Sequence, residues 1–259
     1  MAVRRRAFNI EKTPAFAQRD YLRKICAGVS GLKAVVLDAE VAAAVSLTFL
    51  ESEAFEQQVF LFQDIEQLGV ERLAGVSAIC LLIASSRNLQ VLAQQLAAPA
   101  FKAYHLFFLS ELDPAGLRQL ARADATGAVK RVCRVFFHFF APTFESFHAP
   151  PAAAAGRLTS AANALLSVFA SLKEFPRIRF LAGSADCRHV AERLADALGP
   201  FSDEFAHDAT TLIVLERGED PVTPLLTQWD YLSVLHQLLG LHGNQFALRG
   251  EQRNLNCFA

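Results

Sequence analysis

Short apolar runs alternate with amphipathic runs along most of this chain, and this alternation restricts its fold more than any other feature. Four runs in the first half have strand length and branched apolar content: residues 33–40, 58–65, 76–84 and 102–110. Segments with helical spacing separate them, among them 41–57, a helix capped by Ser85 or Ser86, and a helix opening with Pro114. Apolar strands separated by helices predict an α/β fold with a parallel sheet covered on both faces.

The order continues beyond residue 128, with one interruption. Residues 129–141 are expected to be a helix that turns into a strand near Val135, and the proline- and alanine-containing stretch 141–156 is the predicted domain boundary. Beyond it, we expect strands at 177–183 and 210–216. Helices fill the remaining segments: one before the first of these strands, one ended by Gly199, and one over 225–240 ended by Gly240. Two strands are too few for a doubly wound sheet, so this second domain is expected to be incomplete. The predicted domains are 1–145 and 146–248, followed by a divergent tail at 249–259.

Composition excludes several classes of protein. A formal net charge of −1 argues against a nucleic-acid partner, which would favour a basic excess. No apolar run reaches the roughly 18 to 20 residues of a membrane-spanning helix, and no apolar segment follows the basic N-terminus as in a signal peptide. The five cysteines are odd in number and far apart, without a CxxC pair, which predicts a reducing, cytoplasmic setting and no zinc or other metal site.

An enzyme is the alternative that a parallel sheet keeps open, because such sheets bind ligands at the carboxyl ends of their strands. Asp38, directly after the first predicted strand, is where a catalytic carboxylate would stand. Its other interpretation, a polar strand end that caps a loop, is favoured. The chain also contains no glycine-rich nucleotide-binding motif, no P-loop and no nucleophile elbow. We therefore expect no cofactor and no small-molecule ligand.

The sequence Asp220-Pro-Val-Thr-Pro224 follows the last predicted strand. Pro221 and Pro224 hold φ near −65°, and the short oxygen-bearing side chains of Asp220 and Thr223 suit hydrogen bonds to backbone N–H groups of their own loop. The segment holds no nucleophile. It is predicted to be a rigid, buried structural turn.

This turn and its surroundings carry a resemblance to a known family. LIVLERGEDPVTPLLTQWDYLSVLHQLLGL resembles the signature of the SM (Sec/Munc) family of syntaxin-binding regulators of membrane fusion. The matching positions are Arg217, Asp220, Pro221, Val222, Thr223, Pro224, Leu225, Leu226, Gln228, Trp229, Tyr231, His236, Leu238, Leu239 and Gly240. Glu216, Asp230 and Leu232-Ser233 depart from it. Upstream, LKAVVLDAEVAAAVSLTFLESEAFEQQVFLFQDIE is similar to the first domain of the endosomal vacuolar-protein-sorting branch.

The resemblance implies an arch of three domains, in which two α/β domains flank a helical insertion. On this expectation the chain holds the first domain and part of the second, and the insertion is missing. It also implies a function that is not enzymatic: binding a syntaxin-type SNARE to regulate vesicle docking and fusion between Golgi, endosome and vacuole. The protein would be cytoplasmic, reaching Golgi and endosomal membranes only through SNAREs.

The family further implies a pocket on the outer face of the first domain that takes a short N-terminal peptide of syntaxin. Carried over to this sequence, its main apolar position is Leu117, with Leu120 one turn further along the same helix. Val132 and Phe136 would form the opposite wall. Arg134 stands where the family often has an acidic residue, so it would repel the basic residue of the family's peptide. Spacing alone leaves a second interpretation open, in which all four apolar residues belong to an ordinary core.

Overall fold

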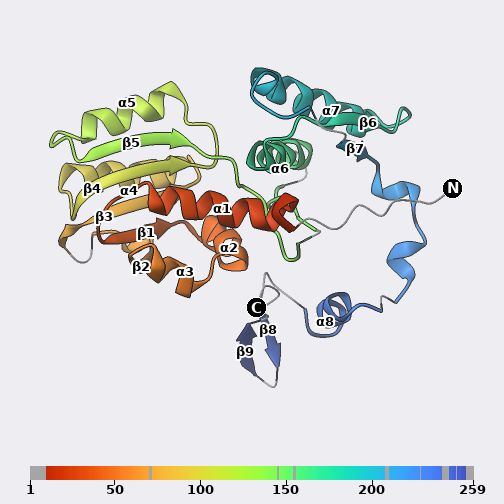
Figure 1. Ribbon diagram of the computed structural model, residues 1–259, viewed down its shortest axis with the longest axis horizontal. Coiled ribbons are helices and arrows are strands. Elements are labelled where there is room, and N and C mark those ends of the chain that lie inside the picture. The colour runs from red at the N-terminus through yellow and green to blue at the C-terminus, as the bar shows by residue number, and fades with distance from the viewer. Residues whose placement is uncertain are drawn as a thin grey trace. The chain divides into compact units, whose positions relative to one another are not determined.

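The structure, a computed structural model, describes residues 10–69, 72–144, 146–153, 156–207, 210–227, 229–240, 245–248 and 250–254. The chain forms two compact units, one of residues 18–138 and one that combines the residues before 18 with those from 139 onward. The division falls just before the proline-containing stretch at 141–156. Each unit is described separately below (Figure 1).

The first unit is built on a five-stranded parallel sheet with the order β2-β1-β3-β4-β5. Its strands are β1 (Lys33–Leu37), β2 (Val59–Asp64), β3 (Leu73–Leu82), β4 (Phe101–Phe108) and β5 (Val129–Arg134). The order reverses between β1 and β3, which is the usual ligand position in an open α/β sheet. The four strands predicted in this half are therefore confirmed.

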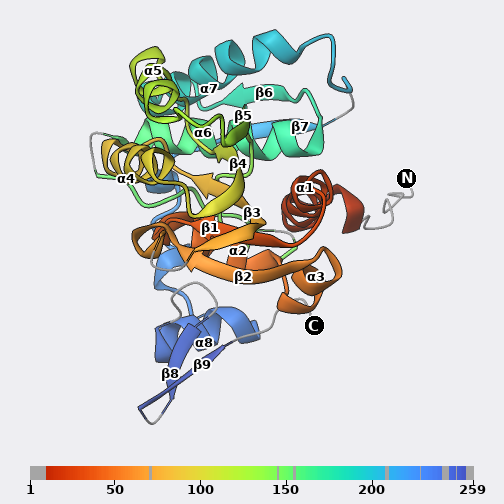
Figure 2. The same cartoon turned by 90° about the vertical axis from the view of Figure 1, so that its left-hand side faces the viewer.

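Helices cover both faces of this sheet. The helices of the unit are α1 (Pro14–Ala27), α2 (Ala39–Thr48), α3 (Glu51–Glu56), α4 (Ser86–Ala97) and α5 (Pro114–Ala123). Figure 2 shows α1 on one side of the sheet and α4 on the other. The face under α4 and α5 holds a buried apolar cluster that includes Leu92, Tyr104, Leu106 and Leu120. Ser85 caps α4, and its hydroxyl accepts a hydrogen bond from the Asn88 backbone N–H, as predicted.

Two predictions in this unit were wrong. Residues 129–134 form β5 rather than a helix, because they pair in parallel with β4, and the chain leaves the sheet after Arg134. Residues 41–57 are not one helix but two, since Phe49 and Leu50 adopt extended backbone between α2 and α3. In both places tertiary pairing and packing override the preference of the local sequence.

The second unit contains α6 (Arg157–Leu172), β6 (Arg177–Phe180), α7 (Ala185–Leu198), β7 (Thr211–Val214), α8 (Tyr231–Leu239), β8 (Gln245–Leu248) and β9 (Glu251–Asn254). β6 and β7 form a parallel pair, whereas β8 and β9 form an antiparallel hairpin that the sequence did not predict. Part of the expected tail at 249–259 is thus β9, and residues 255–259 lie outside the described part. Among the described helices, none has the length and apolar character to cross a bilayer.

Helix ends in this unit differ partly from expectation. Gly240 has φ of 68° and ends α8 in the left-handed conformation, as predicted. Gly199 has φ of −46° and instead continues α7 into a short 3-10 helix, Gly199–Phe201. The helix predicted over 225–240 begins only at Tyr231, where the Asp230 carboxylate accepts a hydrogen bond from the Ser233 backbone N–H.

Candidate functional site

The start of α5 sets which of its side chains reach the surface. The Asp113 carboxylate accepts a hydrogen bond of 2.7 Å from the backbone N–H of Gly116, and Pro114 occupies the first turn. A Cβ on Gly116 would lie 2.8 Å from Leu89 of α4, so glycine allows α5 to pack closely there. In this orientation Leu120 is buried at 3% exposure, whereas Leu117 is 48% exposed.

Leu120 therefore differs from the role that the resemblance implied for it. It belongs to the apolar cluster beneath α4 and α5 and does not line the outer surface. The three-residue spacing correctly placed the two leucines near each other. It could not show that the core boundary passes between them.

Val132 lies on the same face of the sheet as this helix. It pairs in register with Leu106 of the buried cluster, and paired residues of adjacent strands point to the same face. It remains 40% exposed because β5 is the outermost strand of the sheet. Leu117 and Val132 are thus two exposed apolar side chains on the layer formed by α5 and β5.

Charged and aromatic side chains lie at the carboxyl end of β5, beyond Val132. The Arg134 guanidinium carbon lies 5.0 Å from the ring centroid of the half-buried Phe136. Arg134 Nη1 is also 3.9 Å from Glu111 Oε2. We call Leu117, Val132, Phe136, Arg134 and Glu111 the α5–β5 surface. Glu111 was not predicted from the sequence as a site residue. The only signal for it was its position shortly before Asp113, the residue that caps α5.

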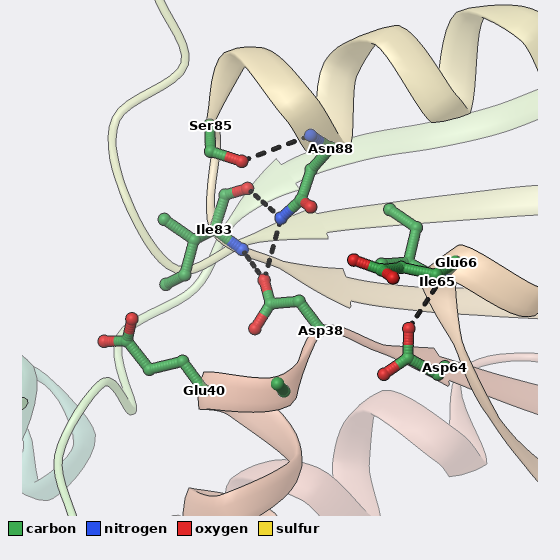
Figure 3. A pocket seen from close by; sticks show the side chains of 9 residues that line it. Asp38, Glu40, Asp64, Ile65, Glu66, Ile83, Ser85 and Asn88 are labelled. Atoms are coloured by element: carbon green, nitrogen blue, oxygen red, sulfur yellow. Dashed lines mark hydrogen bonds between the residues drawn. The ribbon is translucent and has the colours of Figure 1, made fainter.

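A cleft of about 250 Å³ lies at the carboxyl ends of β1, β2 and β3. Its lining consists of Asp38, Ala39, Glu40, Asp64, Ile65, Glu66, Ile83, Ser85 and Asn88. Figure 3 shows the Asp38 carboxylate pointing towards Ile83 and Asn88. It accepts hydrogen bonds from the backbone N–H groups of Val41 at 2.9 Å and Ile83 at 2.7 Å, and from Asn88 Nδ2 at 2.9 Å.

The other acids of this cleft also have protein partners. Asp64 accepts a hydrogen bond from the Glu66 backbone N–H at 2.7 Å, Glu66 pairs with Arg87 at 2.6 Å, and Glu40 lies 2.8 Å from His138 Nε2. In the described residues, no three His, Cys, Asp or Glu side chains are grouped to hold a metal ion. Asp38 is a structural cap, although of helix α2 rather than of a loop, and its carboxylate also holds Ile83, directly after β3, and Asn88 of α4.

The Asp220 turn holds itself together through the Asp220 carboxylate as predicted, whereas the Thr223 side chain bonds that carboxylate rather than the loop backbone. Asp220 Oδ1 accepts hydrogen bonds from the backbone N–H groups of Val222 at 3.2 Å and Thr223 at 3.0 Å. Arg217 Nη2 donates to the Asp220 carbonyl at 2.7 Å and lies 3.2 Å from Oδ2. Hydrogen bonds from Thr223 hold the pKa of the Asp220 carboxyl below its usual value.

The turn is exposed, however, rather than buried. Large apolar side chains in and after it are also exposed, at 59% to 98%: Val222, Leu225, Leu226, Trp229, Tyr231 and Leu238. Pro221 and Pro224 lie in the same exposed stretch. Gln228 falls outside the described residues. Local hydrogen bonds therefore shape this turn without help from a surrounding core.

Comparison with known proteins identifies the family. The chain matches the Sec1 family over residues 33–255. It belongs to the Sec1 family. The chain is also 30% identical over 246 residues to vacuolar protein sorting-associated protein 45 of Dictyostelium discoideum. This match covers 89% of the chain and 43% of that protein. The homologue of that protein in Arabidopsis thaliana is 30% identical over 252 residues, covering 89% of this chain and 44% of the homologue.

Solved structures agree with this assignment. The SM protein Vps45 superposes on the Sec1-family chain with a TM-score of 0.82 at 25% identity, over 96% of this chain and 52% of that one. Vps45 in complex with the Qa SNARE Tlg2 superposes with a TM-score of 0.83 at 26% identity, over 94% and 48%. The chain thus spans about half the length of the relatives that it matches, and the predicted partial SM fold is confirmed.

Proposed function

We propose that this chain binds a syntaxin-type SNARE and regulates vesicle docking and membrane fusion between Golgi, endosome and vacuole. The observation that carries the proposal is the match to vacuolar protein sorting-associated protein 45 over 89% of the chain. A solved relative of this fold is a complex of Vps45 with a Qa SNARE. The protein acts in the cytoplasm and reaches Golgi and endosomal membranes through its SNARE partner.

The function is binding rather than catalysis. The carboxylate at the sheet's switch point, Asp38, already accepts hydrogen bonds from Val41, Ile83 and Asn88. A general base needs a carboxylate that can reach the proton of a substrate. A structural cap with three donors around it fits that role poorly.

The α5–β5 surface is the site that we assign to the N-terminal peptide of the syntaxin. Leu117 and Val132 offer an exposed apolar contact on one layer of the first unit, and Phe136 extends it. Leu120 supports Leu117 from below as part of the core. This site lies in the predicted domain 1–145, and the segment 146–248 is the start of the second SM domain.

The test is a substitution at Leu117. An arginine there places a charge in the apolar contact, so the affinity for a synthetic peptide of the N-terminal residues of Tlg2 should fall by more than tenfold in calorimetry. Because Leu117 is 48% exposed, the fold should be unaffected, as circular dichroism checks.

Gln119→Arg is the matched control. Gln119 is exposed on α5, about 200° around the helix from Leu117, and gains the same charge. It should bind the peptide as the unmodified chain does. Undiminished affinity in Leu117→Arg would remove this surface from the proposal.

A further inference from the structure

The outermost strand of the first unit is strongly basic. β5 carries Lys130, Arg131 and Arg134, all of them exposed. In the sheet, Arg134 pairs with Phe108, and Val132 pairs with Leu106. Because residues two apart on a strand point to the same face, Arg134 lies beside Val132 on the α5 side of the sheet. Arg131 pairs with His105 and points to the opposite face. Of the two arginines, only Arg134 borders the apolar contact of the α5–β5 surface.

The Arg134 side chain is positioned by its neighbours. Its guanidinium lies over the Phe136 ring at 5.0 Å, an arrangement that favours a flat, defined orientation of the charge. Its acidic neighbour Glu111 is 3.9 Å away, with a side chain that is 84% exposed. Ion pairs as exposed as this one contribute little to stability. A second carboxylate arriving with a ligand can therefore exchange with Glu111 at small cost.

We infer that the α5–β5 surface selects a peptide with an aspartate or glutamate next to its apolar anchor, and that Arg134 binds this carboxylate. The inference rests on the proposed function for the docking of a peptide at this surface. A planar guanidinium binds a carboxylate through two parallel hydrogen bonds, which gives specificity as well as attraction. A lysine or arginine of the peptide at the same place would meet a like charge.

Charge-scanned peptides test the inference. The N-terminal peptide of Tlg2 is synthesised in versions that carry Asp or Lys at each position in turn, and their dissociation constants are measured by fluorescence anisotropy at low salt. We expect one position of the peptide, or two neighbouring positions, at which the Asp version binds the unmodified chain about tenfold more tightly than the Lys version. Arg134→Glu should reverse this preference. Glu111→Gln should tighten binding of the Asp version about twofold, because a competing carboxylate is removed.

Lys102→Glu provides the control for net charge. Lys102 is exposed on β4, six residues before Phe108, the partner of Arg134 in the sheet, and therefore about 20 Å away along the strand. Lys102→Glu changes the formal charge by the same amount as Arg134→Glu. The Lys102→Glu variant should therefore prefer the Asp version over the Lys version of the peptide as the unmodified chain does.

The outcomes separate the two proposals. If Leu117→Arg abolishes peptide binding but Arg134→Glu leaves the charge preference as it was, this inference is overturned and the docking site stands. If Leu117→Arg binds every peptide as before, the docking site itself is wrong, and the inference falls with it.

Discussion

Replacing Asp38 with alanine removes three hydrogen bonds that join the end of β1 to α2, to the residue after β3 and to α4 at one buried carboxylate. The bond to the Val41 N–H caps α2, and losing such a cap costs about 1 kcal/mol. The bonds from the Ile83 N–H and from Asn88 Nδ2 end on a charged acceptor, and each is worth about 1.5 kcal/mol. Asn88 Nδ2 keeps its bond to the Ile83 carbonyl at 2.9 Å, so it is not left wholly unsatisfied. Together these losses predict that the free energy of unfolding of the first unit falls by about 4 kcal/mol.

Asp64→Ala is the matched comparison. Asp64 also follows a parallel strand, and its carboxylate also begins a helix, but it accepts one hydrogen bond only from within its own turn, from the Glu66 N–H. In the Asp64→Ala variant, the free energy of unfolding of the first unit should fall by about 0.5 to 1 kcal/mol. The difference of about 3 kcal/mol isolates the hydrogen bonds that reach across to β3 and α4.

Native-state hydrogen exchange is the assay, because the chain has two units and a single unfolding transition is not assured. Amides of β1 and β3 in Asp38→Ala should exchange roughly a thousandfold faster than in the unmodified chain, since each 1.4 kcal/mol is a factor of ten. Similar exchange rates in Asp38→Ala and Asp64→Ala would refute the argument. In that case the cross-strand hydrogen bonds would contribute nothing, and the Asp38 carboxylate would again be open to a role in the cleft.

Three further predictions follow from burial and from the exposed turn. Leu120→Ala should lower the free energy of unfolding of the first unit by about 2 to 4 kcal/mol in native-state hydrogen exchange, whereas Leu117→Ala should lower it by less than about 1 kcal/mol; equal losses would contradict the placement of α5. Burial raises the pKa of the Cys80 thiol to about 12, so iodoacetamide at pH 8 should leave Cys80 unlabelled in mass spectra until the chain is unfolded. Hydrogen bonds from Thr223 hold the pKa of Asp220 below its usual value, so they stabilise the turn at neutral pH and are lost as pH falls through that lowered pKa. Asp220→Ala should speed proteolysis within the turn at pH 7 and leave the rest of the fold intact, and unchanged cleavage would show that the carboxylate does not order it.

Local patterns in the sequence predicted a large part of this architecture. Four strands of the first sheet, the cap at Ser85 and the left-handed end of α8 at Gly240 follow from apolar runs, a hydroxyl before a helix and a glycine after one. The hydrogen bonds of the Asp220 turn were also predictable, because they form between residues at most three apart. Family membership rested on residues that can be read directly.

The role of β5 was not predictable in this way. Residues 129–134 carry three basic and three other side chains, a pattern that fits a helix as well as an edge strand. They form a strand because β4 presents an open edge on which to pair. The hairpin of β8 and β9 was missed because its strands are only four residues each and β9, Glu251–Asn254, carries no apolar side chain.

In the candidate site, the features that the sequence predicts and those that depend on tertiary packing are clearly separate. The sequence by itself determined that Leu117 and Leu120 share a helix and that Val132 and Arg134 are two residues apart. Only the tertiary structure decided that Leu120 is buried and Leu117 exposed, and that Arg134 lies near Glu111 and over Phe136. Periodicity is a property of the local backbone, so it can be read from neighbouring residues. Which side of a helix meets the core depends on its packing against α4 at Gly116, and that contact joins segments that are distant in the chain.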